Sequence, residues 1–258
     1  MPTALLSVHD KRGAADLARV LVEAGWRVLS SGGTAAHLAD HGVPVVDVAD
    51  LTGSGAILGH RVVTLHPAVH AGILADLDDP THRADLERLG IEPIALVVVN
   101  LYPFAANPGV ELIDVGGPAM VRGAAKNHAH VAVVVDPADY GSVADEIRSG
   151  GSVSPETRRN LAVKAFTVTS AYDAGIARWL AGDDEVLPRS LLLAANREDV
   201  LRYGENPHQS GARYSLVGGR GWVGMAPFST AARRRVISTC STPRPRGVWC
   251  IASSVRRA

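Results

Sequence analysis

The sequence predicts an α/β fold, a doubly wound parallel sheet with helices on both faces. Short apolar segments typical of strands alternate with helical segments, which is the rhythm of a parallel sheet. Two apolar runs, residues 94–99 and 131–135, lack polar alternation, as strands buried on both faces do. Ligands of such sheets bind at the carboxyl ends of the strands. We therefore expect the functional residues directly after the strands.

The elements are placed by periodicity and by their boundary residues. Apolar residues recur at helical spacing over 13–23, and Gly25 ends that pattern. Ser154 followed by Pro155 predicts the start of a helix that runs through Ala171 and up to Leu180. Residues 141–150 lead from a helical stretch into that start, and 181–185 are a linker candidate. The expected strands are 4–8, 26–30, 43–48, 94–99 and 131–135, and a further helix follows the turn at 31–34.

Length and hydropathy indicate a soluble globular protein. The 258 residues, 47% of them hydrophobic, suffice for one large domain or two small ones. No apolar run approaches the roughly 18 residues of a membrane span. The short apolar stretch at the N-terminus is followed by the charged residue Asp10 and does not have the pattern of a signal peptide. We expect a cytoplasmic protein with no membrane partner.

The formal net charge of zero is the sum of two parts of the chain with opposite net charge. From Ser215 onward the chain has eight arginines, no acidic residue and both cysteines, Cys240 and Cys250. We divide the chain into a domain at 1–183, a linker and remnant at 184–214, and an aberrant, disordered basic tail at 215–258. We interpret the tail as an out-of-frame translation. The alternative is a disordered tail that binds RNA or another polyanion.

Two loops after consecutive strands are suited to phosphate. Residues 7–11 follow the first strand, and Ser30-Ser31-Gly32-Gly33-Thr34 follows the second. Glycines let the backbone approach a ligand, and helix N-termini bind anions. The spacing is not that of a Rossmann fingerprint. The alternative is a pair of ordinary helix caps with solvated charges.

Three further segments bring polar groups to the expected edge of the sheet. Residues 100–104 close the most apolar strand, and 113–118 and 122–128 follow it. The alternative makes Tyr102 and Phe104 capping aromatics and Lys126 a surface charge. His66 and His70 have helical spacing, but Pro67 lies between them and no carboxylate is near in sequence, so no metal site is expected.

Seven segments occur in the order seen in bifunctional purine-biosynthesis enzymes, which join an N-terminal IMP cyclohydrolase to an AICAR transformylase. The resemblance covers roughly 210 residues. These segments are SVHDK, SSGGTA, RVVTLHP, VVVNLYPF, IDVGGPAMVRGAAKNH, LAVKAF and LRYGENPHQ.

The resemblance implies a methylglyoxal synthase-like, Rossmann-like fold and closure of the inosine ring from a formylated ribonucleotide. It implies a small-molecule nucleotide substrate, a homodimer, no cofactor and no nucleic acid. The residues it assigns to the substrate phosphate are Ser7, Lys11, Ser31, Gly32, Gly33, Thr34 and Arg61. Those it assigns to the reacting base are Thr64, Asn100 and Tyr102, with Asp114 and Lys126 as a polar pair that handles protons.

The chain departs from the family pattern at the expected site. Val63 stands where the family has a lysine credited with stabilising the developing oxyanion, and losing one such donor typically costs about 100- to 1000-fold in rate. Residues 51–56 differ from the usual Thr-Gly-Phe-Pro-Glu, and the loop at 105–112 is short. We therefore also consider a module that binds nucleotide or phosphate without turnover, and a fragment of a broken gene.

Residues 201–209 resemble the entry to the transformylase domain. Arg202, Tyr203 and His208 match residues that contact AICAR in that family. The catalytic Lys-His pair of the transformylase has no counterpart in the sequence, so the resemblance implies no transformylase activity for this chain.

Overall fold

The computed structural model describes residues 1–182, 190, 192, 194–202 and 211–216. Contacts divide the chain into two units, Met1–Ser170 and Ala171–Ala258. The first two residues of the tail predicted at 215–258 belong to a strand, and residues 217–258 lie outside the described residues. The first unit contains the sheet and is described first.

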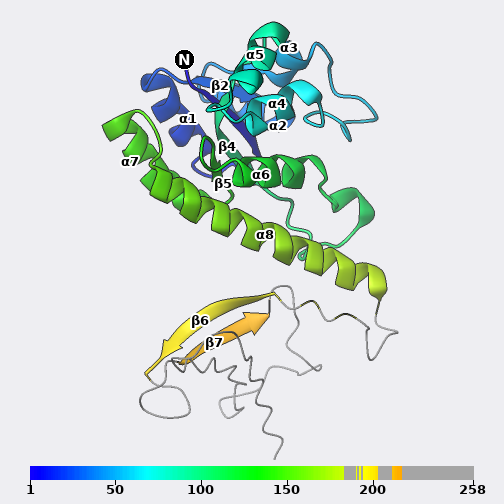
Figure 1. Ribbon diagram of the computed structural model, residues 1–258. Coiled ribbons are helices and arrows are strands. Elements are labelled where there is room, and N and C mark those ends of the chain that lie inside the picture. Colours follow the sequence, from blue (N-terminus) through cyan, green and yellow to red (C-terminus); the bar gives the residue numbers. More distant parts are fainter. Residues whose placement is uncertain (183–189, 191, 193, 203–210, 217–258) are drawn as a thin grey trace, which may run out of the picture. The chain divides into compact units, whose positions relative to one another are not determined.

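A five-stranded parallel sheet forms the centre of the first unit (Figure 1). Its strand order is β3-β2-β1-β4-β5, and every neighbouring pair is parallel. The order reverses between β1 and β4, which is where an open α/β sheet binds its ligands. The predicted α/β class is confirmed. The strands are β1 (Thr3–Val8), β2 (Arg27–Ser30), β3 (Val46–Asp47), β4 (Ile94–Asn100) and β5 (Ala132–Val134).

Helices cover both faces of this sheet and create two separate cores. One core contains residues of α1, α2 and α7, and the other contains residues of α3, α4 and α6. Helix α8 contributes Leu161 to the first core and Ala165 to the second. The helices that begin in this unit are α1 (Ala14–Glu23), α2 (Gly32–Asp40), α3 (Val48–Thr52), α4 (Pro67–Leu74), α5 (Pro80–Leu89), α6 (Gly116–Lys126), α7 (Tyr140–Gly150) and α8 (Pro155–Ala181), with short 3-10 turns η1 (Val110–Leu112) and η2 (Pro137–Asp139). The boundary between the units, after Ser170, falls within α8.

The position of strand β4 between two cores explains why its sequence does not alternate between apolar and polar residues. Leu96 and Val98 face the first core, whereas Val97 and Val99 face the second. All four side chains are almost fully buried. A strand with helices on both faces selects apolar residues at every position, as predicted from the run at 94–99.

Two predicted boundaries were wrong. The strand expected at 43–48 is reduced to Val46–Asp47, because the Asp47 carboxylate accepts a hydrogen bond from the Ala49 amide at 2.8 Å and caps α3. Residues 140–150, which we did not assign, form helix α7.

The start of α8 follows its sequence signal. The Ser154 hydroxyl accepts a hydrogen bond from Thr157 N at 3.2 Å, and Pro155 is the first helical residue. Glu146 of α7 accepts a bond from Ser154 N at 2.7 Å and fixes the entry of the chain. Among the described residues, no helix is both long and apolar enough to cross a membrane.

In the second unit the described residues form an antiparallel pair of strands, β6 (Ala195–Leu201) and β7 (Gly211–Leu216). Leu201 pairs with Gly211 at the end of the ladder.

Candidate active site

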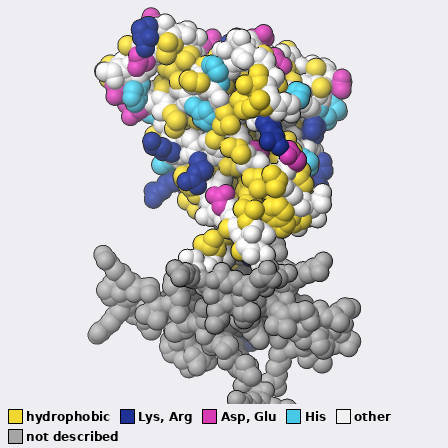
Figure 2. Space-filling view, turned by 90° about the vertical axis from the view of Figure 1, so that its right-hand side faces the viewer, with side chains coloured by type: hydrophobic (Ala, Val, Ile, Leu, Met, Phe, Trp, Pro, Cys, Tyr) yellow, Lys and Arg dark blue, Asp and Glu magenta, His cyan; other side chains and the backbone are white. Residues whose placement is uncertain are grey.

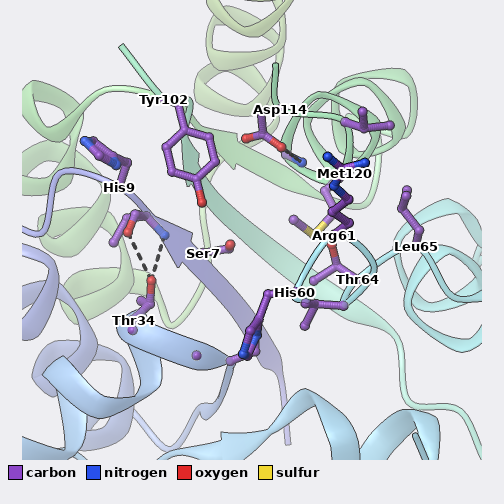
Figure 3. A pocket seen from close by; sticks show the side chains of 18 of the residues that line it. Ser7, His9, Thr34, His60, Arg61, Thr64, Leu65, Tyr102, Asp114 and Met120 are labelled. Atoms are coloured by element: carbon purple, nitrogen blue, oxygen red, sulfur yellow. Dashed lines mark hydrogen bonds between the residues drawn. The ribbon is translucent and has the colours of Figure 1, made fainter. Parts of the chain in front are cut away.

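A cavity of about 840 Å³ lies at the carboxyl ends of β1 and β4, at the point where the strand order reverses. Figure 3 shows its side chains converging from the sheet, α2, α6 and two loops. Its volume is within the range typical of small-molecule sites. The structure brings together Ser7, Lys11, Ser31, Gly32, Gly33, Thr34, Arg61, Thr64, Asn100, Tyr102 and Asp114 from the predicted set on this cavity.

The N-terminus of α2 forms one end of the cavity. Its first backbone N–H groups have no partner within the helix, so they are available to an anion. The Lys11 side chain reaches this end, because a Cβ added to Gly33 would lie 4.0 Å from Lys11 Cε. Backbone donors and an ammonium group therefore meet where the sequence predicted phosphate.

The Thr34 side chain forms hydrogen bonds with the backbone at this end of the cavity. Its hydroxyl accepts a hydrogen bond from Val8 N at 3.0 Å and donates one to Val8 O at 3.1 Å (Figure 3). Thr34 is buried. The side chain thus joins the start of α2 to the end of β1, and Thr34 faces a ligand with its backbone N–H rather than with a free hydroxyl.

Asn100 holds the loop after β1. Its Oδ1 accepts a hydrogen bond from Asp10 N, and its Nδ2 donates one to Asp10 O, both at 2.8 Å. Burial raises the pKa of the neighbouring Tyr140 to about 12, and a hydrogen bond with Asn100 partly opposes the rise. Asn100 borders the cavity, but its amide is engaged with the backbone that positions Lys11.

The N-terminus of α6 forms the opposite end. Asp114 Oδ1 accepts a hydrogen bond from Gly117 N at 2.8 Å, and burial raises the pKa of the Asp114 carboxyl, while that bond acts in the opposite direction. A Cβ at Gly116 would lie 2.9 Å from Thr64 Oγ1. Glycine at this position therefore allows the buried Thr64 hydroxyl to approach the helix start.

Two aromatic rings border the cavity between these ends. The His9 and Tyr102 rings meet edge to face, with centroids 5.1 Å apart and an interplanar angle of 70°. The Tyr102 side chain is 43% exposed, so its ring is accessible to a ligand. Sequence reasoning assigned no role to His9, although its place directly after β1 was a usable signal.

Two loops border the cavity on the right-hand side of Figure 1. Arg61 of the first loop forms an ion pair with Glu111 of η1, in the shortened loop. Val63 lines the cavity beside Thr64, so the substitution noted in the sequence is part of the cavity wall. His60 and Glu111 also line it, and sequence reasoning did not select either residue.

The face toward which these loops project carries mixed charge. Figure 2 shows Lys and Arg, acidic and histidine side chains interspersed with hydrophobic ones.

Lys126 does not join the predicted set. It is exposed at the last position of α6, whereas Asp114 precedes the first turn. Ten residues of helix span about 15 Å, and Lys126 is not among the residues that line the cavity. Asp114 and Lys126 lie at opposite ends of α6, so the structure does not bring the predicted pair together within one chain.

The remaining predicted positions lie apart from the cavity. Arg202 follows β6 in the second unit, and Tyr203 and His208 lie outside the described residues. His66 caps α4, its Nδ1 accepting a hydrogen bond from Ala68 N at 3.1 Å.

Among the described residues, Asp76, Asp78 and His130 offer possible metal-ligand atoms within 4.8 Å of one another. His130 Nε2 lies 3.0 Å from Asp76 Oδ1, and this interaction accounts for the arrangement.

Two family models match the chain. The model described as an MGS-like domain matches residues 13–117, which confirms the predicted fold, and the model described as AICARFT/IMPCHase bienzyme matches residues 124–228. The range 13–117 contains the cavity residues from Ser31 to Gly117.

The chain is similar to proteins named bifunctional purine biosynthesis protein PurH. The protein of Sorangium cellulosum is 54% identical over 232 residues, covering 82% of this chain and 44% of that protein. The protein of Synechococcus sp. (strain WH7803) is 51% identical over 242 residues, covering 86% and 46%. The chain thus spans about half the length of these curated relatives. A solved structure, titled crystal structure of ForH, has a TM-score of 0.63 and 42% identity, covering 68% of this chain and 97% of that chain.

Proposed function

The chain belongs to the PurH family of bifunctional purine biosynthesis proteins, and from this premise we propose that its first unit is an IMP cyclohydrolase. The substrate is the formylated imidazole carboxamide ribonucleotide, and the product is IMP. The observation that carries the proposal is the arrangement of one cavity with anion donors at one end and a half-buried carboxyl beside a helix N-terminus at the other.

The phosphate occupies the end formed by α2. Backbone N–H groups of Gly32, Gly33 and Thr34 donate to the phosphate oxygens, and Lys11 supplies the charge. Ser7 and Ser31 complete the set from the ends of β1 and β2. Asn100 keeps the Lys11 loop in place through its two bonds to the Asp10 backbone.

The reacting arms of the base lie at the end formed by α6. The carboxamide nitrogen attacks the formyl carbon, a C–N bond forms, and the formyl oxygen gains negative charge and then a proton. The formamide nitrogen then loses its proton, the C–O bond breaks, and water leaves as the C=N bond of the new ring forms. Holding the two arms in contact supplies a large part of the acceleration.

Asp114 and the start of α6 serve the proton transfer and the developing charge. A carboxyl whose pKa is raised by burial accepts a proton from the carboxamide nitrogen more readily than an exposed one. The Thr64 hydroxyl and the backbone N–H groups at the N-terminus of α6 are donors for the oxygen. Tyr102 and His9 flank the base between the two ends.

The direct test is conversion of the formylated substrate to IMP by the purified chain, followed by absorbance and confirmed by chromatography of the product. We expect turnover above the uncatalysed rate. Matched variants are Lys11→Met, which raises KM with a small effect on kcat, and Asp114→Asn, which lowers kcat.

The alternative, a module that binds without turnover, is favoured by one observation: Val63 presents an apolar side chain to the cavity. IMP binding without product formation supports this alternative and overturns the cyclohydrolase proposal. Failure to bind IMP overturns both.

A further inference from the structure

The hairpin at the mouth of the cavity has an unusual backbone. Leu58, Gly59 and His60 adopt positive φ angles of 53°, 62° and 70° in succession. Residues Ile57 and Val62 close the hairpin through two backbone hydrogen bonds of 3.0 and 3.4 Å. Side chains other than glycine rarely adopt this conformation, and such residues concentrate at functional sites.

The two non-glycine residues of this turn differ in where their side chains point. His60 lines the cavity, whereas Leu58 does not and is 72% exposed. The left-handed backbone at position 60 thus accompanies an imidazole that borders the cavity. The adjacent Arg61 is tied to Glu111 across the cavity mouth, which restrains the hairpin from its other side.

The His60 ring lies at the phosphate end of the cavity. In Figure 3 it lies on the side of Thr34 and α2, while Asp114 lies on the far side. Lys11, Gly32 and Gly33 line the same cavity. An imidazole offers one N–H donor when neutral and two when protonated, and protonation adds positive charge.

We propose that His60 is a further substrate-binding residue, which donates to the 5′-phosphate and favours nucleotides over nucleosides. The inference rests on the proposed phosphate end of the cavity. The carboxylate of Glu111 neutralises the charge of Arg61, so the His60 imidazole supplies a further donor to the cavity that Lys11 also lines.

Other titratable groups line the same cavity, and their effects on binding must be distinguished from that of His60. They are His9, Lys11, Arg61, Tyr102, Glu111 and Asp114. The phosphate monoester itself titrates near pH 6. A comparison of His60 variants with the unmodified chain at each pH cancels these contributions, because all of them are shared.

The test measures the Kd of IMP and of inosine by calorimetry at several pH values between about 5.5 and 8. His60→Asn keeps a residue that tolerates positive φ, and we expect it to bind IMP about ten-fold more weakly than the unmodified chain. Inosine binding should not change.

Leu58→Gly is the matched control, because it relaxes the same hairpin without altering the cavity wall. We expect IMP binding equal to that of the unmodified chain. An equal loss in Leu58→Gly and His60→Asn, or an IMP affinity unchanged in His60→Asn at every pH, overturns the assignment of His60. Failure of the unmodified chain to prefer IMP over inosine instead overturns the phosphate site, and with it the proposed function.

Discussion

The carboxylate of Asp114 lies directly against the backbone of Gly117. Its Oδ1 accepts a hydrogen bond from Gly117 N at 2.8 Å, and a Cβ placed on Gly117 would overlap Oδ2. The Asp114 carboxylate can therefore occupy this position only because residue 117 is a glycine. This contact fixes the proposed proton acceptor at the start of α6.

Gly117→Ala should displace Asp114 and lower kcat about 100-fold, since a misplacement of about 1 Å costs that much. IMP affinity should change less, because the phosphate end is remote from α6. Gly141→Ala is the control: nothing lies within 4 Å of a Cβ there, so a small gain in helix stability and unchanged turnover are expected. Equal kinetics in both variants would contradict the role of the Gly117 contact.

The stability of the protein should respond to Asp114 with a defined sign. Burial raises its folded pKa above the unfolded value of 3.8, so the neutral carboxyl is favoured in the folded state. The stability it contributes is fully present below the unfolded pKa and is lost as pH rises through the folded pKa.

Asp114→Asn removes the buried charge, so thermal unfolding at pH 7 should occur at a higher temperature than in the unmodified chain. The difference should shrink as pH falls toward 4. Turnover should fall about 100-fold or more. A variant that is less stable at pH 7, with no narrowing at acidic pH, would show that the hydrogen bond to Gly117 outweighs the cost of burying the charge.

The sequence predicted most of the sheet because β1, β2, β4 and β5 consist mainly of buried side chains. Leu96 to Val99 alternate between the two cores, and so do Ala132 to Val134 of β5. A side-chain hydrogen bond can end a strand before the point where its apolar pattern ends, as the Asp47 cap of α3 does at β3. Such caps depend on geometry that periodicity does not contain.

The cavity brings together predicted residues that directly follow a strand, whereas a helix separates two predicted residues that lie near each other in the sequence. Lys11 and Thr34 follow β1 and β2, and both reach the cavity. Asp114 and Lys126 are close in sequence but lie at the two ends of α6. His60 carries no recognisable motif, and only its backbone angle and its place on the cavity reveal it.

Lys126→Met tests this correction. The residue is exposed in the last turn of α6, where a cation interacts favourably with the helix dipole. We expect a loss of stability of about 0.5 kcal/mol and turnover within about two-fold of the unmodified chain. A large fall in kcat with unchanged stability would return Lys126 to the active site and would require it to act on a second copy of the chain.

Thr34→Val should weaken both the fold and the phosphate end. The variant leaves Val8 N and Val8 O without their 3.0 and 3.1 Å partner in a buried region, at a cost of about 1–3 kcal/mol. Thr34→Ser keeps the hydroxyl and should recover most of the stability in chemical denaturation. If the valine and serine variants are equally stable, the two hydrogen bonds do not join α2 to β1 as described.

Val63→Lys places a flexible ammonium group in the wall of the cavity, beside Thr64 and near the proposed reacting oxygen. One preorganised donor is worth about 100- to 1000-fold in rate, and an introduced side chain lacks part of that preorganisation, so we expect kcat to rise about ten-fold or more. Val63→Met has a long side chain without charge and should give no gain. The gain should appear in kcat rather than KM, because the charge on the oxygen develops only during the reaction. A Val63→Lys variant with unchanged kcat would place the developing charge elsewhere in the cavity, whereas a lowered KM alone would place the new ammonium group against the phosphate.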